Sequence, residues 1–409
     1  MSEKKNVPKL RFPEFTEPWE QRKLGEISDK VTKKNQDVVV DEVFTNSAEY
    51  GIISQRDFFD KDIANTENID GYYVVEPNDF VYNPRISTTA PFGPIKRNKL
   101  ERSGAMSPLY YVFRPNNVDL SYLEWFFQTS CWYPFMRFNG NSGARSDRFA
   151  ITDKIFNEMP ISLPQDIEEQ KRIGMFLTTL DTLITLHQRK LDHVKDLKKS
   201  MLQKMFPKNG QLYPEVRFPE FTDAWEQRKW IDTVDISTEM VDPTSGEYDD
   251  MPHIAPGNIE SFTGRILDNV KTVKEEQLIS GKFRFRPNDV VYGKINPQLG
   301  KYFYSCVNGL TSADAYVFNG KHGITQKFLF ALLQTSDFFK YSVSVSKRSG
   351  MPKINRDELN AYVFLAPREE EQDKIGSFLL NIDHLITLHQ RELDHLKLLK
   401  KGMLQQMFV

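Results

Sequence analysis

The stretch Leu183–His193, LITLHQRKLDH, decides the architecture of this chain because it recurs almost unchanged as Leu385–His395, LITLHQRELDH. A second stretch, Pro8–Lys23 (PKLRFPEFTEPWEQRK), recurs as Pro214–Lys229 (PEVRFPEFTDAWEQRK). The order is therefore module, helix, module, helix. A duplication of this kind predicts a body with pseudo-two-fold symmetry, which suits either two identical partners or two similar sites on one ligand.

The first repeat lies in two long predicted helical segments, 164–207 and 367–409. Each segment opens with a proline followed by acidic residues, and its apolar residues then recur about every 3.5 positions, as in the seam of a coiled coil. Because neither segment can bury its stripe alone, we expect the two helices to pair in antiparallel fashion. The predicted seam comprises Ile173, Phe176, Leu180, Leu183, Leu191, Val194, Leu197, Met201 and Met205, with the counterparts Ile375, Phe378, Ile382, Leu385, Leu393, Leu396, Leu399, Met403 and Met407.

A histidine interrupts each predicted seam, at His187 and at His389. Equivalent residues meet at the midpoint of an antiparallel pair, so we expect these two side chains to approach each other. Two interpretations stay open, namely a pair of tolerated histidines with no special role and a pH-sensitive contact.

The two modules, 1–163 and 208–366, have the pattern of mixed α/β domains. Short β-branched and aromatic runs such as 72–75, 80–82, 109–113 and 315–318 predict strands, and turn residues separate them. Helices are expected at 120–128 and 326–334. The predicted fold class is α+β, with two α/β modules separated by two long antiparallel helices and four segments at 1–163, 164–207, 208–366 and 367–409.

Composition excludes several classes of protein. The chain has 409 residues, of which 39% are hydrophobic, so it can bury more than one core. Two cysteines without metal-ligand spacing, no signal-like start and no long apolar run favour a cytoplasmic protein. The net charge of −2 does not indicate nucleic-acid binding in bulk. Any surface that contacts phosphate must therefore come from basic residues that cluster on one face of a module.

The sequence contains no recognisable catalytic or nucleotide-binding motif. HExxH, GxSxG and GxGxxG are absent. The segment Gly293–Tyr302 has the wrong glycine spacing for a phosphate loop and ends on Tyr where Ser or Thr is required. We therefore predict no catalytic residue, metal or cofactor in this chain.

Both modules carry two polar loops that suit nucleic-acid contact. The sequence Pro-Asn-Asp leads through a strand into 83–89 in the first module and into 293–298 in the second, and the loop tips differ. This is the pattern expected when one scaffold presents different side chains to different base edges. Basic, glycine-bearing loops at 139–148 and 346–353 suit backbone phosphates. The alternatives are ordinary surface turns that have drifted and solvated basic turns.

The aromatic residues of the second repeat also have two interpretations. Trp19 and Trp225 could act as stacking platforms for a ligand. We favour the other interpretation, in which Phe12, Phe15, Trp19 and their copies pack each module against the helix ends.

Taken together, RFPEFT…WEQRKLGEI, PNDVVYGKINPQLGK and EEQKRIGMFL…DTLITLHQRKLDHVKDLKKSMLQKMF resemble the specificity subunit of type I restriction-modification enzymes over nearly the whole chain. The resemblance implies that each module is a target-recognition domain reading half of a split, asymmetric sequence in double-stranded DNA. It also implies that the helices separate the two domains and dock two modification (methyltransferase) subunits. S-adenosylmethionine, ATP and Mg²⁺ would bind to the modification subunits and to restriction/translocase subunits. The resemblance implies no cofactor for this chain.

The resemblance and the loop chemistry together select candidate DNA-contacting residues. The first module departs from the family pattern by reading Asn-Pro-Arg-Ile where the second has Gly-Lys-Ile-Asn-Pro. The candidates are Tyr82, Asn83, Arg85, Arg145 and Arg148 in the first module and Tyr292, Lys294, Asn296, Lys301, Lys347, Arg348 and Lys353 in the second.

Two rival functions stay open at this point. One is a self-sufficient nuclease or methyltransferase, which requires motifs that the sequence lacks. The other is a structural adaptor that binds protein partners through two similar modules. A stiff pair of helices between two readers would act as a ruler for the gap between half-sites, since readers on one face of B-DNA are spaced by about 34 Å per helical turn.

Overall fold

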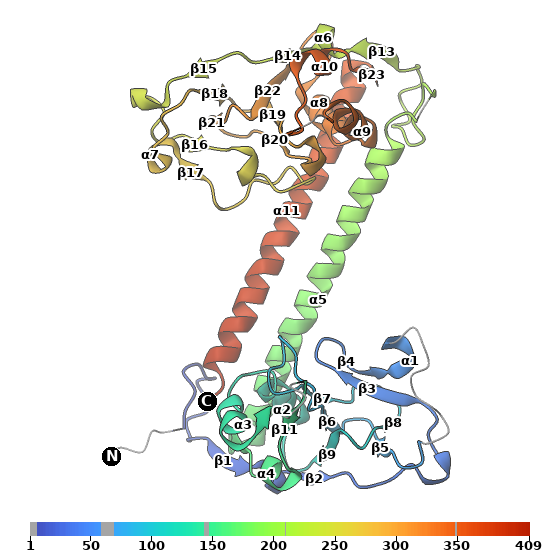
Figure 1. The fold of residues 1–409 in the computed structure, drawn as a ribbon, viewed down its shortest axis with the longest axis vertical. Helices are drawn as coiled ribbons and strands as arrows, with labels where there is room; N and C mark the ends of the chain where they lie inside the picture. The colour runs from blue at the N-terminus through green and yellow to red at the C-terminus, as the bar shows by residue number, and fades with distance from the viewer. Residues whose placement is uncertain (1–5, 59–68, 143–146, 209, 348–349) are drawn as a thin grey trace. The chain divides into compact units, whose positions relative to one another are not determined.

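The computed structural model describes residues 6–58, 69–142, 147–208, 210–347 and 350–409. The chain divides into two compact units. Unit 1 consists of Met1–Leu186 and Asp394–Val409, and unit 2 consists of His187–Leu393. The helices α5 (Ile167–Lys204) and α11 (Glu369–Gln406) each contribute one part to each unit (Figure 1). The two long helices are thus present where the repeat predicts them, whereas the division into four segments stays a prediction.

The described part of unit 1 forms two four-stranded sheets and two short strand pairs. Its helices are α1 (Gln55–Phe58), α2 (Leu120–Phe126), α3 (Tyr133–Asn139) and α4 (Asp153–Asn157). Its strands are β1 (Glu20–Lys23), β2 (Ser28–Lys30), β3 (Val43–Ser47), β4 (Gly51–Ser54), β5 (Tyr73–Val75), β6 (Phe80–Tyr82), β7 (Ile95–Arg97), β8 (Gly104–Met106), β9 (Tyr111–Pro115), β10 (Asn141–Ser142), β11 (Phe149–Ala150) and β12 (Pro160–Leu163). The sheets have the orders β2-β9-β6-β7 and β4-β3-β8-β5, and the pairs are β1-β12 and β10-β11.

Unit 2 repeats this plan. Its shorter helices are α6 (Trp230–Thr233), α7 (Val273–Glu276), α8 (Gln326–Leu333), α9 (Ser336–Val345) and α10 (Arg356–Asn360). Its strands are β13 (Glu226–Lys229), β14 (Val234–Ile236), β15 (Met240–Val241), β16 (Pro252–His253), β17 (Lys271–Thr272), β18 (Lys282–Phe285), β19 (Val290–Gly293), β20 (Tyr302–Tyr304), β21 (Gly309–Thr311), β22 (Ala315–Gly320) and β23 (Val363–Ala366). The order β14-β22-β19-β20 matches β2-β9-β6-β7, and the second sheet has the order β15-β18-β21-β16-β17.

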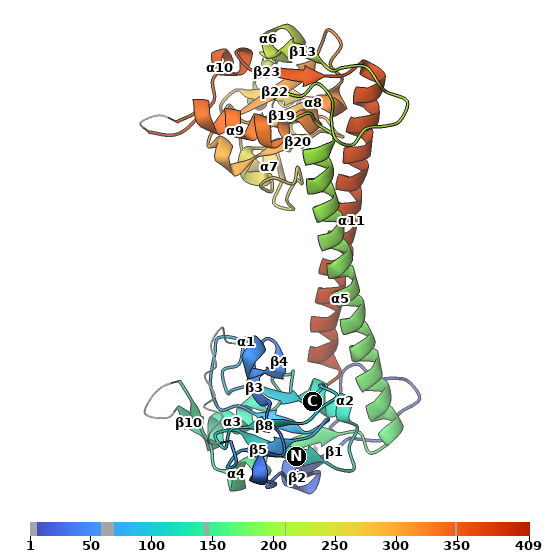
Figure 2. The same ribbon diagram turned by 90° about the vertical axis from the view of Figure 1, so that its right-hand side faces the viewer.

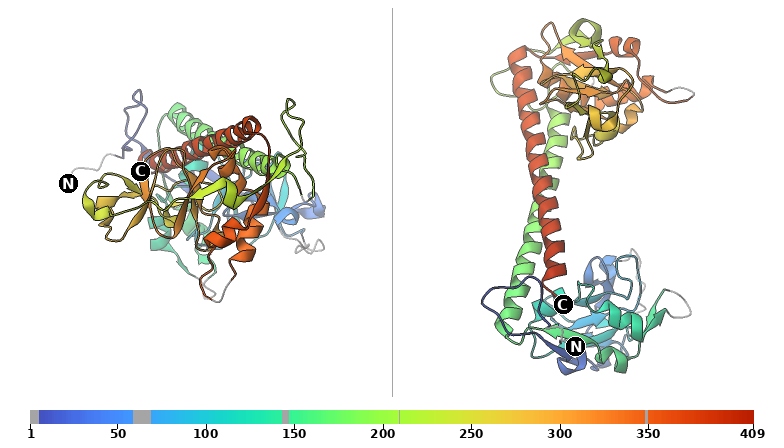
Figure 3. Two further views of the ribbon diagram at one scale, coloured as in Figure 1. Left: turned by 90° about the horizontal axis from the view of Figure 1, so that it is seen from above. Right: turned by 90° about the vertical axis from the view of Figure 1, so that its left-hand side faces the viewer.

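Inside each unit the two long helices run antiparallel, as the sequence predicts. In unit 2, His187 lies against His389 with ring centroids 6.1 Å apart, and Lys198 forms an ion pair with Asp383 at 2.5 Å. Residue numbers therefore rise along α5 while they fall along α11, and the views agree that the two segments lie side by side (Figures 1 and 3). In unit 1, Lys400 reaches Asp181 at 2.5 Å. The predicted meeting of the two histidines is confirmed.

The predicted seam, however, has the wrong helical phase in part. Leu177 is 0% exposed, whereas the predicted seam residues Leu183 and Leu385 are 40% and 45% exposed. The ends of the helices pack into the cores of the sheets as well as against each other, since Ile173 and Leu177 join the core of unit 1 and Leu379 joins that of unit 2. A heptad pattern that assumes one helical partner misses this second contact.

The repeated Arg-Phe-Pro-Glu-Phe-Thr segment docks on the helix ends in both units. Arg11 donates to Glu169 at 2.6 and 2.8 Å, and Arg217 donates to Glu371 at 2.8 Å through both nitrogens. Trp19 and Trp225 are 3% and 2% exposed. The packing interpretation of this repeat is therefore confirmed, because indoles this deeply buried offer no stacking surface to a ligand.

None of the helices that the structure describes is both long enough and apolar enough to cross a membrane.

Candidate nucleic-acid interface

Each candidate loop begins at the same tight turn. Asn78 and Asn288 both have φ of +73°, in the left-handed region that Asn tolerates better than most residues. The carboxylates of the next residues, Asp79 and Asp289, accept the backbone N–H groups of Glu76 and Arg286 at 2.8 Å. These bonds close the turn and fix where the following strand starts.

The strands β6 and β19 carry the chain from this turn to the loop tip. Every residue of both strands is buried, and each strand lies inside its four-stranded sheet between two neighbours. A strand held in this way delivers its last residue to a fixed position, so the loops that follow start from equivalent points in the two units.

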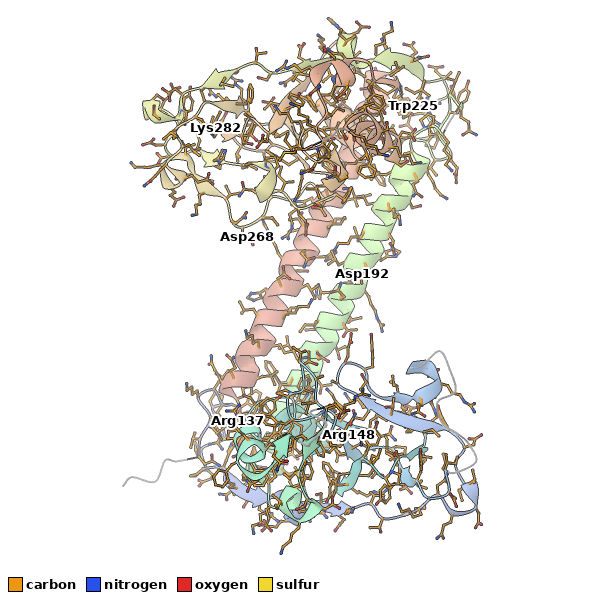
Figure 4. All side chains as sticks on the ribbon, in the orientation of Figure 1. Arg137, Arg148, Asp192, Trp225, Asp268 and Lys282 are labelled. Carbon is orange, nitrogen blue, oxygen red and sulfur yellow. The ribbon has the colours of Figure 1, made fainter. Side chains whose placement is uncertain are left out.

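In unit 1 the two candidate loops meet at an isolated β-bridge between Arg85 and Arg148. The N–H of Ile86 donates to Asp147 at 3.0 Å, and the N–H of Phe149 donates to Pro84 at 2.8 Å. Arg148 is labelled in Figure 4, and the α3–β10 segment that precedes this second loop is visible in Figure 2. Loops whose bridged residues are 63 positions apart in sequence thus form one composite surface.

Unit 2 repeats the same bridge between Ile295 and Lys353. The N–H of Asn296 donates to Pro352 at 2.8 Å, and the N–H of Ile354 donates to Lys294 at 3.0 Å. The backbone scaffold of the two loop pairs is therefore shared, while the residues at its bridge differ. We call these two surfaces the bridged loops.

The charges on the bridged loops are arranged differently in the two units. In unit 1 both bridge residues, Arg85 and Arg148, are exposed arginines, and neither has an ion-pair partner among the described residues. In unit 2 only Lys353 is an exposed basic bridge residue, and Lys294 beside it is half-buried over the ring of Tyr316 at 5.1 Å. At the bridge itself, unit 1 thus offers two planar guanidinium groups and unit 2 offers one ammonium group, that of Lys353.

One basic residue of this surface escaped the sequence analysis. The guanidinium of Arg356 lies 5.7 Å from the ring centre of Tyr316 and donates to the carbonyl oxygens of Ile236 and Ser237 at 3.1 Å each. Burial lowers the pKa of Lys294, and the neighbouring charges of Lys353 and Arg356 lower it further against the opposing effect of Asp314. Arg356 is the first residue of helix α10, beyond the glycine-bearing loop, so loop composition gave no signal for it.

Two of the predicted contact residues are in the core. Tyr82 is 3% exposed, stacks on Phe156 with centroids 4.7 Å apart, and donates its hydroxyl to Phe92 at 2.9 Å. Tyr292 is 2% exposed and stacks on Phe318, and burial raises its pKa to about 12. Neither ring has surface to offer a base, so their role here is packing.

Three further predicted residues shape the loops. Asn83 donates to Asn46 at 2.8 Å and accepts from the N–H of Arg85 at 2.9 Å. Asn296 has φ of +49°, directly precedes the short 3₁₀ turn at Pro297–Leu299, and accepts a hydrogen bond from the side chain of Gln298 at 3.2 Å. The ammonium of Lys301 donates to the backbone oxygen of Ile259. Hydrogen bonds inside the protein thus occupy these side chains at least in part.

The remaining predicted residues differ in position. Lys347 is exposed just beyond α9. Arg145 and Arg348 lie outside the described residues.

A second feature, a lysine-lined pocket beside the helices, occurs in both units. The unit 2 pocket has a volume of 340 Å³ and the unit 1 pocket one of 620 Å³. Equivalent residues of the repeats line both pockets, namely Lys195, Lys198, Lys199, Leu202, Gln203, Gln334, Thr335, Ser336, Phe339 and Ile386 in unit 2 and Lys397, Lys400, Lys401, Leu404, Gln405, Gln128, Thr129, Ser130, Tyr133 and Ile184 in unit 1.

Exposed leucines on the long helices also recur at equivalent positions. Leu183 and Leu186 are 40% and 46% exposed in unit 1, and Leu385 and Leu388 are 45% and 42% exposed in unit 2. They belong to the stretch that the two repeats share almost completely. Recurrent apolar surface of this kind is typical of an interaction face.

Comparison with known proteins assigns the class. The family model described as "Type I restriction modification DNA specificity domain" matches residues 16–196 and, separately, residues 223–398. The chain therefore belongs to the family of type I restriction-modification DNA specificity domains and contains that domain twice.

The individual relatives have low sequence identity to this chain. The chain is 26% identical over 290 residues to the type I restriction enzyme EcoDI specificity subunit of Escherichia coli, a match covering 65% of this chain and 63% of that protein. It is 26% identical over 273 residues to the MjaVIII specificity subunit of Methanocaldococcus jannaschii, covering 61% of each. Both matches thus span less than two thirds of the relative. The crystal structure of the type-I restriction-modification system S subunit from M. genitalium shares the fold, with a TM-score of 0.63, 11% identity and coverage of 98% of this chain and 99% of that one.

Proposed function

We propose that this chain is the non-catalytic DNA-recognition subunit of a type I restriction-modification complex. Each unit would read one half of a bipartite, asymmetric target in double-stranded DNA. The observation that carries this proposal is the pair of bridged loops, in which one backbone scaffold recurs in both units with different side chains at its tip. A shared scaffold with unlike readers suits a target whose halves differ in sequence.

The chemistry of the bridged loops supports this role. Arginine can donate two parallel hydrogen bonds to guanine O6 and N7, and lysine can bind phosphate or a purine edge. Arg85 and Arg148 are adjacent and exposed in unit 1, and Lys353 and Lys347 are exposed in unit 2. In a chain with a net charge of −2, these residues give each unit exposed basic charge that could face phosphate.

The helices would dock two copies of a modification subunit. The recurrent exposed leucines and the recurrent lysine-lined pockets support this, because two equivalent surfaces suit two copies of one partner. Restriction/translocase subunits would join the same complex. Adenine methylation and ATP-dependent cleavage, with S-adenosylmethionine, ATP and Mg²⁺, would reside on these partners. The complex would act in the cytoplasm, where the chromosome is.

The unbroken helices would also set the gap between the half-sites. Each contains 38 residues, which corresponds to about 57 Å of α-helix. A helix pair is stiffer than a loop of equal length, so the distance between two readers attached to it would be fixed.

The decisive experiment is a genome-wide map of methylated adenines in the host strain with the chain, without it, and with the chain restored on a plasmid. We expect a split motif with two specific halves and a constant gap, present only when the chain is present. A motif without a gap, or a methylation pattern that does not depend on the chain, would refute the proposal. If the chain binds a protein partner but methylation is the same with and without the chain, the structural-adaptor function would be favoured.

A further inference from the structure

In unit 2 the two long helices bring together three side chains that can bind a metal ion. His187 from α5 and His389 from α11 face each other with ring planes at 63°, and both are half-buried at 21% and 23% exposure. Glu392 lies three residues after His389 and therefore on the same face of α11. These are the only three His, Cys, Asp or Glu residues that cluster in this way among those described.

The distances in the cluster fit one small ion. The Oε2 atom of Glu392 lies 3.1 Å from Nδ1 of His187 and 3.5 Å from Nδ1 of His389, and one ligand atom from each residue lies within 4.8 Å of the others. A tetrahedral ion with bonds of about 2.1 Å separates its ligand atoms by about 3.4 Å. Two of the three separations are therefore already close to the required length.

The Nδ1 atoms of both histidines lack a hydrogen-bond partner among the described residues. Both Nδ1 atoms are shielded from solvent, and neither forms a hydrogen bond of normal geometry with any described residue despite the nearby carboxylate. A buried nitrogen without a partner carries a free-energy cost, which a metal–nitrogen bond would remove.

The carboxylate stands at the one position where the repeated stretches differ. The first copy reads LITLHQRKLDH with Lys190, and the second reads LITLHQRELDH with Glu392. A lysine at both positions would surround the histidine pair with cations and repel a metal ion. The glutamate instead completes a set of two neutral nitrogens and one anionic oxygen, which suits Zn²⁺ and similar divalent transition metals.

We propose that His187, His389 and Glu392 bind one divalent transition-metal ion, with Zn²⁺ as the best match, and that this ion clips α5 to α11. Three protein ligands leave a fourth position for water. Because the ligands come from both helices, binding stabilises their pairing. The proposal does not depend on DNA recognition.

The test is a metal titration of the purified full chain after treatment with a chelator. Zn²⁺ is added in competition with a chromophoric chelator, and Co²⁺ is added separately to record its visible absorption. We expect one ion per chain, a tetrahedral Co²⁺ spectrum, and at least a tenfold loss of affinity in each of His187→Ala, His389→Ala and Glu392→Lys. The control His193→Ala removes an exposed histidine from the same helix, α5, and should leave the affinity for Zn²⁺ unchanged.

Hydrogen exchange separates a lost ligand from a misfolded variant. Zn²⁺ should slow exchange in peptides that contain 187–193 and 389–393 of the unmodified chain and leave them unchanged in Glu392→Lys, whose exchange without metal should match that of the unmodified chain. The absence of binding by the unmodified chain would overturn the proposal. Equal affinity in Glu392→Lys, or an equal loss in His193→Ala, would also overturn it.

Discussion

Arg85 and Arg148 share one β-bridge, whereas the equivalent bridge of unit 2 joins Ile295 to Lys353. If each unit reads one half of the DNA target, as proposed, a change in one unit should alter only that half. We expect Arg85→Ala and Arg148→Ala to relax bases of one half-site, at about 1–3 kcal/mol per lost bidentate contact, and Lys353→Ala to affect only the other half. Adenine methylation maps of each variant measure this. Relaxation of both halves by one substitution would contradict it.

The buried tryptophans allow a second comparison of single residues. Nε1 of Trp19 donates to Glu169 at 3.3 Å, whereas Nε1 of Trp225 has no partner among the described residues. We expect Trp19→Phe to destabilise unit 1 by about 1 kcal/mol more than Trp225→Phe destabilises unit 2, because only the first removes a hydrogen bond to a charged group. Hydrogen exchange of peptides from each unit gives both values, and equal losses would show that the indole N–H contributes nothing.

At the scale of residues, the sequence predicts which residues form a strand better than it predicts which of their side chains are exposed. The Phe-Val-Tyr run 80–82 correctly predicts a strand, but all three side chains are buried because Phe80 and Tyr82 belong to one core cluster and Val81 belongs to another. Tyr82 and Tyr292 adjoin the loops in sequence, so sequence alone assigned them to DNA contact. Their partners, such as Phe156, come from distant segments that no local pattern identifies. The bridge between loops is also a long-range contact, which explains why the loops were predicted separately.

At the scale of elements, the long helices follow from the repeat, but the phase of their buried faces does not, since it depends on the sheets they pack against. The helix pair contains a buried ion pair, Lys198–Asp383 in unit 2, whose side chains are 8% and 17% exposed. Its counterpart in unit 1, Lys400–Asp181, is 23% and 48% exposed. The same Lys–Asp ion pair is therefore more deeply buried in unit 2 than in unit 1.

This difference predicts unequal costs for equivalent substitutions. Lys198→Met should destabilise unit 2 by about 3 kcal/mol at pH 7, because it leaves a buried carboxylate unpaired, whereas Lys400→Met should cost about 1 kcal/mol. Burial already raises the pKa of Asp383 in the folded state, and losing Lys198 removes a charge that lowers it. The folded state therefore takes up a proton more readily than the unfolded state, and the deficit of the variant should shrink as pH falls from 7 towards about 4. Hydrogen exchange at both pH values tests the sign.

The exposed leucines support a prediction about partner docking. Leu183→Glu and Leu385→Glu place a charge on recurrent apolar positions that are solvent-exposed in the free chain. If one modification subunit docks at each position, as proposed, each substitution should remove one copy without unfolding the protein. Native mass spectrometry should show loss of one copy in either variant and of both copies in the double variant. Leu398→Glu is the control, because Leu398 is 69% exposed and its counterpart in the first repeat is Asp196. Loss of partners in this control would place the docking face elsewhere.

At the scale of the whole molecule, the duplicated order of module and helix predicts a ruler. The unit boundaries fall within both helices, after Leu186 in α5 and after Leu393 in α11. Four residues inserted at both points preserve the contacts inside each unit and add about 6 Å of helix, close to one turn. If the helices set the spacing, the gap in the methylated motif should lengthen by about one or two base pairs at 3.4 Å each while both half-site sequences stay the same. Insertion of four residues into only one helix makes the two helices unequal in length and should abolish methylation. A motif with its original gap after the double insertion would show that the helices do not measure the DNA.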